Sequence, residues 1–122
     1  MKILICGSRE FTDYGHFVRN MNEYLSSADL SKIEIVSGGA RGADTFAEQY
    51  AADRGIKFTK FPADWKKYGR SAGYVRNVEM AKYCSGPKNC CVGFWDGKSL
   101  GTKHMFNTAL KERMSVMKFI IK

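Results

Sequence analysis

The sequence predicts an α/β fold, a doubly wound, Rossmann-like three-layer sandwich around a five-stranded parallel sheet. Short apolar runs recur along the 122 residues, helical patterns fill the segments between them, and no repeat or linker interrupts the series. Strict alternation of strands and helices calls for a parallel sheet covered on both faces. Right-handed crossovers then favour the strand order 3-2-1-4-5. We expect a single domain over residues 1–122, a usual domain size.

The first strand is expected over 2–6, where the apolar run KILIC ends before a glycine. A helix can begin at Thr12 or Asp13, because either side chain can cap free backbone N–H groups. Apolar residues then follow at helical spacing: Val18, Met21 and Leu25.

The second strand is expected over 32–36, in KIEIV. The glycine-rich octet SGGARGAD follows it, and then a helix that we expect to end at Gly55. The alternating stretch IKFTKF, 56–61, predicts a third and more exposed strand that ends at Pro62.

In the second half, PADWKKYGRSAGYVRN has no clean periodicity and predicts a long loop, with a helix from 72–75 to about Cys84. A loop of that length usually has a function. NCCVGFW, 89–95, predicts the fourth strand, and Ser99 can cap a last helix. SVMKFII, 115–121, predicts the fifth strand, at a sheet edge that a second copy of the chain could cover in a homo-oligomer.

Composition narrows the class of protein. The net charge of +8 lies entirely in residues 62–122, which carry twelve Lys/Arg against four Asp/Glu, whereas residues 1–61 carry eight of each. This asymmetry favours an anionic partner, and a solvated basic surface is the alternative. No apolar run approaches the roughly 20 residues of a membrane span, and polar residues follow MKILIC at once, unlike a signal peptide. We therefore expect a cytoplasmic protein without a membrane partner.

The cysteines do not predict a metal site. Cys6, Cys84, Cys90 and Cys91 form no C-x-x-C pair, and the chain has only two histidines. We expect buried, reduced thiols, no metal and no cofactor.

A ligand crevice is expected where the winding of the sheet reverses, at the carboxyl ends of the first and fourth strands. Four segments that follow strands collect glycine, hydroxyl and cationic residues there: GSREF, SGGARGAD, PADWKKYGRSAGYVRN and WDGKSLGT. The segments at the opposite edge are typical of ordinary helix ends. A plain glycine turn is the alternative for the octet, but this one-sided distribution favours a ligand site.

The crevice is suited to anions. The amides of 39–42, at a helix start, can donate to phosphate oxygens, and Arg9, Arg41 and Arg76 offer planar forks for phosphate or carboxylate. An aromatic ring from Trp65, Tyr68 or Tyr74 could stack on a base or simply cover the sheet edge. Neither a P-loop nor a G-x-G-x-x-G fingerprint is present, which disfavours a kinase or an ordinary dehydrogenase.

Four motifs together resemble the YspA-like branch of the SLOG superfamily, small Rossmann-like proteins related to the LOG phosphoribohydrolases and to the core domain of DprA. They are ICGSREFTD at 5–13, SGGARGAD at 37–44, FPADWKKYGRSAGYVRNVEM at 61–80 and FWDGKSLGTKHM at 94–105. The resemblance implies a nucleotide-binding crevice and a nucleotide-derived ligand such as a relative of ADP-ribose. The expected ligand-binding residues are Gly7, Ser8, Arg9, Gly38, Gly39, Ala40, Arg41, Gly42, Asp44, Asp64, Trp65, Arg76, Asn77, Ser99, Gly101 and Thr102.

Catalysis does not carry over with the resemblance. LOG enzymes cleave the N-glycosidic bond of nucleoside monophosphates with an arginine before a helix and a glutamate in P-G-G-x-G-T-x-x-E. Arg76 looks like that arginine, but Met105 stands where the glutamate would be, and a thioether cannot take up a proton. A binding protein that senses or sequesters its ligand is therefore favoured.

Two alternatives stay open. One is a nucleotide N-glycosidase that uses another carboxylate, for which Asp44, Asp64 and Glu79 are the candidates. Asp44 can instead cap its helix, and Asp64 can instead bond ribose hydroxyls or loop amides. The other alternative is a nucleic-acid-binding protein, which the basic second half would suit.

Overall fold

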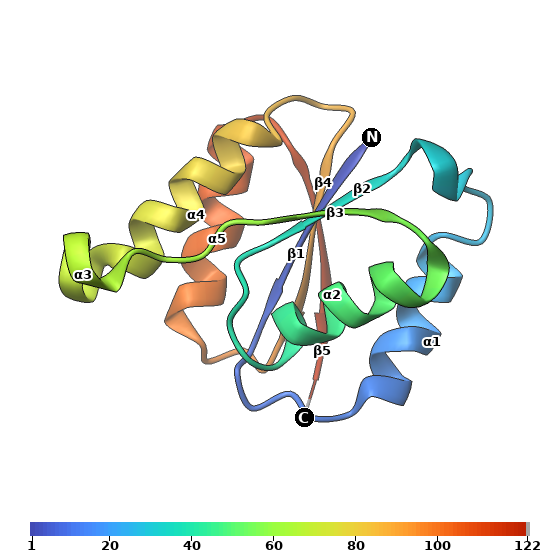
Figure 1. Ribbon diagram of the computed structural model, residues 1–122, viewed down its shortest axis with the longest axis horizontal. Helices are drawn as coiled ribbons and strands as arrows, with labels where there is room; N and C mark the ends of the chain where they lie inside the picture. Colours follow the sequence, from blue (N-terminus) through green and yellow to red (C-terminus); the bar gives the residue numbers. More distant parts are fainter. Residues whose placement is uncertain (122) are drawn as a thin grey trace.

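The computed structural model, which describes residues 1–121, contains one parallel sheet in the order β3-β2-β1-β4-β5, with helices on both faces (Figure 1). The predicted fold class and strand order are confirmed. The strands are β1 (Lys2–Gly7), β2 (Glu34–Ser37), β3 (Lys57–Lys60), β4 (Cys90–Trp95) and β5 (Ser115–Ile120).

Two helices cover each face of the sheet. One face carries α1 (Tyr14–Tyr24) and α2 (Ala43–Arg54), and the other carries α4 (Ala72–Tyr83) and α5 (Leu100–Lys111). A single turn, α3 (Trp65–Tyr68), projects at the far left of Figure 1, away from the sheet. No helix within residues 1–121 is long and apolar enough to cross a membrane.

Two predicted elements were wrong. The second strand begins at Glu34 rather than at position 32, because Asp29 accepts a hydrogen bond from the Ser31 amide (3.1 Å) and starts a 3-10 turn over Leu30–Lys32. The stretch expected to be a loop contains α3 and a second 3-10 turn, Gly69–Ser71. Every other strand boundary lies within one residue of the prediction.

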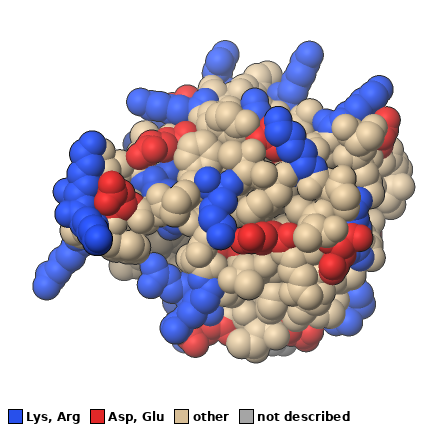
Figure 2. Space-filling model, viewed as in Figure 1, with Lys and Arg blue, Asp and Glu red and all other residues tan. Residues whose placement is uncertain are grey.

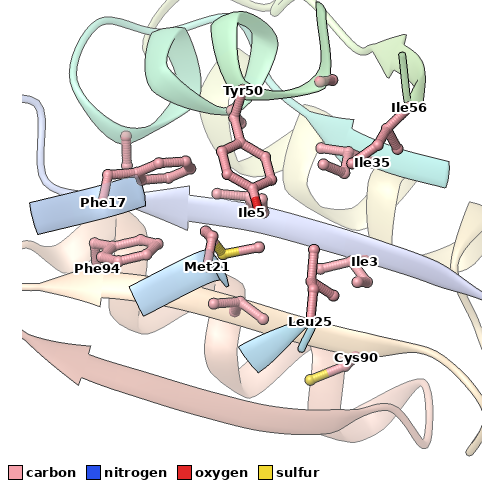
Figure 3. Packing of buried hydrophobic residues seen from close by; sticks show 14 of the residues in the cluster. Ile3, Ile5, Phe17, Met21, Leu25, Ile35, Tyr50, Ile56, Cys90 and Phe94 are labelled. Carbon is pink, nitrogen blue, oxygen red and sulfur yellow. The ribbon is translucent and has the colours of Figure 1, made fainter. Parts of the chain in front are cut away.

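The core consists of two apolar layers, because alternate residues of each strand point to opposite faces of the sheet. Figure 3 shows the first layer, where Ile3 and Ile5 of β1 lie beside Phe17 and Met21 of α1 and Tyr50 of α2. The second layer packs α4 and α5 against the other face, with these members at its centre: Leu4, Cys6, Val36, Met80, Cys91, Met105 and Phe106. All four cysteines are buried and free, as expected.

The central position of β1 determines where a site can form. It pairs with β2 on one side and with β4 on the other. The chain leaves β1 and β2 toward the face of α1 and α2, and leaves β3 and β4 toward the face of α4 and α5. The loops therefore separate at the carboxyl end of β1, where open α/β sheets bind ligands.

Candidate functional site

A hollow of about 450 Å³ opens at this carboxyl edge, and we call it the first hollow. The loops after β1, β2 and β4 form its walls together with α3, α4 and α5. Most of the expected binding residues line it: Gly7, Ser8, Arg9, Ala40, Asp44, Trp65, Arg76, Asn77, Ser99, Gly101 and Thr102.

A second hollow of about 520 Å³ adjoins the first. The two share four lining residues: Arg9, Ala40, Trp65 and Arg76. Gly38, Gly39 and Arg41 line only the second hollow, so the three arginines expected to act together all face it. Arg9 and Arg76, which line both hollows, form a cationic wall between them, and Arg41 extends this wall on the side of the second hollow. Two adjoining spaces separated in this way suit a ligand that has an anionic centre.

Close backbone contact brings the loops after β1 and β2 together. Gly42, which precedes α2, has φ of +82°, and a Cβ there would collide with the Ser8 carbonyl oxygen and lie 3.0 Å from the Arg9 Cα. A Cβ at Gly7 would lie 2.5 Å from the Phe94 carbonyl oxygen. Only glycine fits such a position without strain. Gly42 lines neither hollow, and its lack of a side chain lets the loops after β1 and β2 approach each other.

Arg76 lies flat over Gly38. Its Nη1 donates to the Gly38 carbonyl oxygen at 2.7 Å, and a Cβ at Gly38 would lie 2.6 Å from the Arg76 Cζ. Burial lowers the pKa of Arg76 and the Asp44 carboxylate opposes that shift, yet an arginine remains charged. Because Gly38 has no side chain, the Arg76 guanidinium can occupy the space that a Cβ would fill.

Asp44 holds the octet loop from inside. Its side chain is buried in the first turn of α2, and its Oδ2 accepts a hydrogen bond from the Ala40 amide at 3.1 Å. Burial raises the pKa of Asp44 to about 6, although the Ala40 amide and the charges of Arg76 and Arg9 act in the opposite direction. The Ala40 amide is therefore occupied, so the expected row of phosphate-binding amides over 39–42 is incomplete.

The loop after β4 is fixed by its own polar groups. Asp96 accepts hydrogen bonds from the amides of Lys98 (2.8 Å) and Ser99 (2.9 Å), which lowers its pKa. The Asp96 amide in turn donates to the Ser8 hydroxyl (3.3 Å), and the Ser99 hydroxyl accepts from the Thr102 amide (3.4 Å). As predicted, Ser99 caps α5. Asp96 also lines the first hollow, a role that the D-G pair after β4 could have suggested.

Aromatic and apolar groups complete the first hollow. Trp65 is 52% exposed at the boundary of the two hollows, and Tyr74 stands in the first hollow with its ring 4.5 Å from that of His104. Tyr68 lines neither hollow. Met105 and Cys6 supply buried apolar surface, so the position of the LOG glutamate lies in the hollow but carries no carboxylate.

Six of the expected binding residues and candidate carboxylates lie outside the first hollow: Gly38, Gly39, Arg41, Gly42, Asp64 and Glu79. Asp64 accepts a hydrogen bond from the Lys67 amide (3.1 Å) and caps α3. Together with Glu79 it lines a different hollow, of about 240 Å³. Arg41 is exposed and forms a 2.6 Å ion pair with Glu10. An exposed pair of this kind contributes little to stability, so Arg41 is available to a ligand in the second hollow.

The lining residues that sequence reasoning missed are Cys6, Glu10, Arg70, Gly73, Met80 and Asp96 in the first hollow and Pro62 and Ala63 in the second. Met80 and Gly73 lie on the side of α4 that faces the hollow, and only the packing of α4 against α5 reveals that. Within residues 1–121, no three His, Cys, Asp or Glu side chains are arranged to hold a metal ion.

Two comparisons with known proteins found similarities to this chain. Residues 1–68 match the model of a family described as YAcAr, the YspA, cpYpsA-related SLOG family. This range contains the loops after β1 and β2, which contribute most of the cationic wall. Over 123 aligned residues, the chain is also 32% identical to the Gene 61 protein of Mycobacterium phage D29, and the alignment covers 97% of this chain and 95% of that relative.

Proposed function

Because the chain belongs to the YspA, cpYpsA-related SLOG family, we propose that it binds a phosphorylated nucleotide derivative across the two hollows and thereby senses or sequesters it. Membership in this family indicates nucleotide-related binding or a related activity. The finer assignment rests on one observation, which is the convergence of Arg9, Arg41 and Arg76 on the octet loop. SGGARGAD then acts as a phosphate-binding loop.

The energetics of this wall support a phosphorylated ligand. Each charge-assisted hydrogen bond to an anion contributes on the order of 1.5–3 kcal/mol. For a ligand with two phosphates, Arg9 and Arg76 at the shared wall together with Arg41 in the second hollow could therefore supply much of the roughly 8 kcal/mol that a micromolar ligand needs. The first hollow also has the size usual for a small-molecule site, about 300–1,000 Å³.

The shape of the site favours a ligand with two parts over a mononucleotide. A base and ribose would occupy the first hollow against Trp65 or Tyr74, and phosphates would meet Arg9 and Arg76 at the shared wall. A second ribose or base would extend past Arg41 into the second hollow. Molecules related to ADP-ribose or NAD have this arrangement. A cytoplasmic location would give access to them and would keep the thiols reduced.

Isothermal titration calorimetry with AMP, ADP, ADP-ribose and NAD tests the proposal. We expect ADP-ribose or NAD to bind more tightly than AMP, and Arg76→Ala to weaken that binding by at least tenfold. Lys82→Ala is the matched control, because Lys82 is an exposed cation of the same helix that lines neither hollow. Equal losses in the two variants, or no binding of any phosphorylated compound, would overturn it.

Hydrolysis of an N-glycosidic bond is a second candidate, favoured by the position of Asp44. Its Oδ2 accepts a hydrogen bond from the Ala40 amide, and the buried Asp44 side chain also lines the open first hollow. A carboxyl group with a pKa near 6 can pass a proton at neutral pH. Water would add to the ribose carbon as the bond to the base breaks, and the base would leave with a proton. Chromatography after incubation with NAD or AMP should then detect free base, and Asp44→Asn should abolish it; equal release by the variant would exclude this role.

A further inference from the structure

Asn77, on α4, connects Arg76 of the site to His104 of α5. Its side chain is buried at the floor of the first hollow, beside Arg76. Its Oδ1 accepts from the Arg76 Nε at 3.2 Å, and its Nδ2 donates to the Gly101 carbonyl oxygen at 3.3 Å. The same Nδ2 lies 3.1 Å from the Nδ1 of His104. Both polar atoms of the amide therefore have protein partners, and Asn77 also lines the first hollow, where we expected it to contact a ligand.

These partners determine the state of His104. A guanidinium can only donate and a carbonyl oxygen can only accept, so the Asn77 amide has a single possible orientation. Its NH₂ group then faces the His104 ring, whose Nδ1 must accept. His104 is consequently the neutral tautomer that carries its proton on Nε2.

The surroundings of His104 favour that neutral form. The ring packs against Tyr74, and no acidic side chain forms an ion pair with it within residues 1–121. Burial lowers the pKa of His104, and the charge of Lys111, on the same helix, lowers it further. The unprotonated Nδ1 of His104, which accepts the hydrogen bond from the Asn77 Nδ2, is thus present at neutral pH.

We propose that His104, acting through Asn77, is a positioning residue that holds the Arg76 guanidinium over Gly38. The inference rests on the proposed function, in which Arg76 meets the anionic part of the ligand. Without an acceptor at His104, the Asn77 Nδ2 would lose one of its two hydrogen-bond partners and would be held by the Gly101 carbonyl oxygen alone. The Oδ1 that accepts from the Arg76 Nε would then be held less rigidly, and so would the orientation of Arg76 toward the hollows.

Three variants separate positioning from packing. His104→Phe keeps a flat ring against Tyr74 but removes the acceptor, whereas His104→Asn places an amide oxygen near the position of Nδ1. Asn107→Ala is the control, because Asn107 is an exposed residue of the same helix. Two quantities are measured: the Nε–H resonance of Arg76 in the ligand-free protein, by ¹⁵N–¹H NMR, and the Kd for ADP-ribose, by calorimetry.

We expect His104→Phe to shift or broaden the Nε–H resonance and to raise the Kd by about three- to tenfold, as the loss of one neutral hydrogen bond predicts. His104→Asn should restore both quantities and Asn107→Ala should change neither. An unchanged Nε–H resonance in His104→Phe, or a His104→Asn protein that behaves like His104→Phe, would overturn the inference.

Two results keep this test separate from that of the proposed function. If the parent protein binds no phosphorylated compound, the proposed function fails, and the Nε–H resonance of the ligand-free variants still decides the role of His104. If His104→Phe does not fold, a two-bond ¹H–¹⁵N spectrum of the parent protein decides instead. It should show an unprotonated Nδ1 at pH 7, and a protonated Nδ1 would contradict the inference.

Discussion

Replacement of Gly38 by alanine should remove the ligand-binding form of Arg76 with little effect on the fold. The added Cβ would lie 2.6 Å from the Arg76 Cζ and 2.9 Å from its Nε, well inside van der Waals contact. The group that must move is the end of a flexible side chain, not backbone, so the strain can be relieved at small cost. The guanidinium would, however, lose its bond to the Gly38 carbonyl oxygen and its place in the shared wall.

The size of the effect follows from the bonds that Arg76 would make to an anion. One lost charge-assisted hydrogen bond of about 1.5–3 kcal/mol corresponds to a rise in Kd of roughly 10- to 100-fold. Calorimetric titration of Gly38→Ala with ADP-ribose measures this rise, and thermal unfolding checks that the fold is intact.

Gly101→Ala is the matched control for this experiment. Gly101 also lines the first hollow, but a Cβ there would meet nothing within 4 Å, and alanine is the better helix former. We expect Gly101→Ala to be slightly more stable and to keep most of the parent's affinity, because the added methyl group enters the hollow without touching Arg76. If Gly38→Ala also binds like the parent, the assignment of Arg76 to the ligand is refuted.

Four further predictions follow from the same geometry. Burial raises the pKa of Asp44 to about 6, so between pH 4 and 6 the folded protein holds a proton that the unfolded chain has lost. The protonated carboxyl group therefore stabilises the fold fully below pH 4, and its contribution to the free energy of unfolding disappears as the pH rises through 6. Urea unfolding should thus show the parent losing about 1–3 kcal/mol between pH 4 and 7, and a pH profile of Asp44→Asn as steep as that of the parent would contradict the cause. Trp65 lies at the boundary of the hollows, so ligand should quench its fluorescence, and quenching that persists in Trp65→Phe would assign the signal to Trp95. Arg41→Ala should weaken ADP-ribose but leave AMP unchanged, because Arg41 lines the second hollow only; an equal effect on both ligands would exclude a two-part site. Finally, gel shifts with single-stranded DNA across a salt series should show weak binding, whereas tight binding that falls steeply with salt would favour a nucleic-acid partner.

For the nucleic-acid alternative, the candidate contact surface is the group of exposed cations on and just after α3. Figure 2 shows Lys and Arg side chains gathered where α3 projects from the body, and Lys66, Lys67 and Arg70 are all exposed there. The first hollow lies beside this surface, and Arg70 belongs both to the surface and to the lining of the first hollow. The salt series therefore separates a polymer that binds α3 from a small molecule that binds the hollows.

The fold could be predicted because its signals are local and repeat along the chain. Apolar runs of four to six residues, caps such as Asp13 and Ser99, and a terminal glycine at position 55 each act within one element. Parallel topology then follows from alternation alone. The start of β2 was misjudged because Asp29 captures the Ser31 amide, a local competition that an apolar run does not reveal.

The site was predictable as an edge of the sheet but not as a set of contacts. In the sequence, Asp44 and Asp64 look alike, because each stands beside a helix start. Only the structure shows that Asp44 lines the first hollow, whereas Asp64 caps α3 outside it. His104 gave no signal at all, because its connection to Arg76 passes through a buried amide on another helix. Side-chain direction and hydrogen-bond partners depend on packing between elements that are distant in sequence.

An NMR titration of the isotopically labelled protein with ADP-ribose tests the existence of the site most directly. We predict saturable chemical-shift changes in the amides of Gly39 and Ala40, the indole of Trp65 and the Nε–H of Arg76, with a single Kd in the micromolar range. Changes confined to the lysines of α3, or no changes at millimolar ligand, would contradict the assignment of the two hollows to a phosphorylated nucleotide derivative.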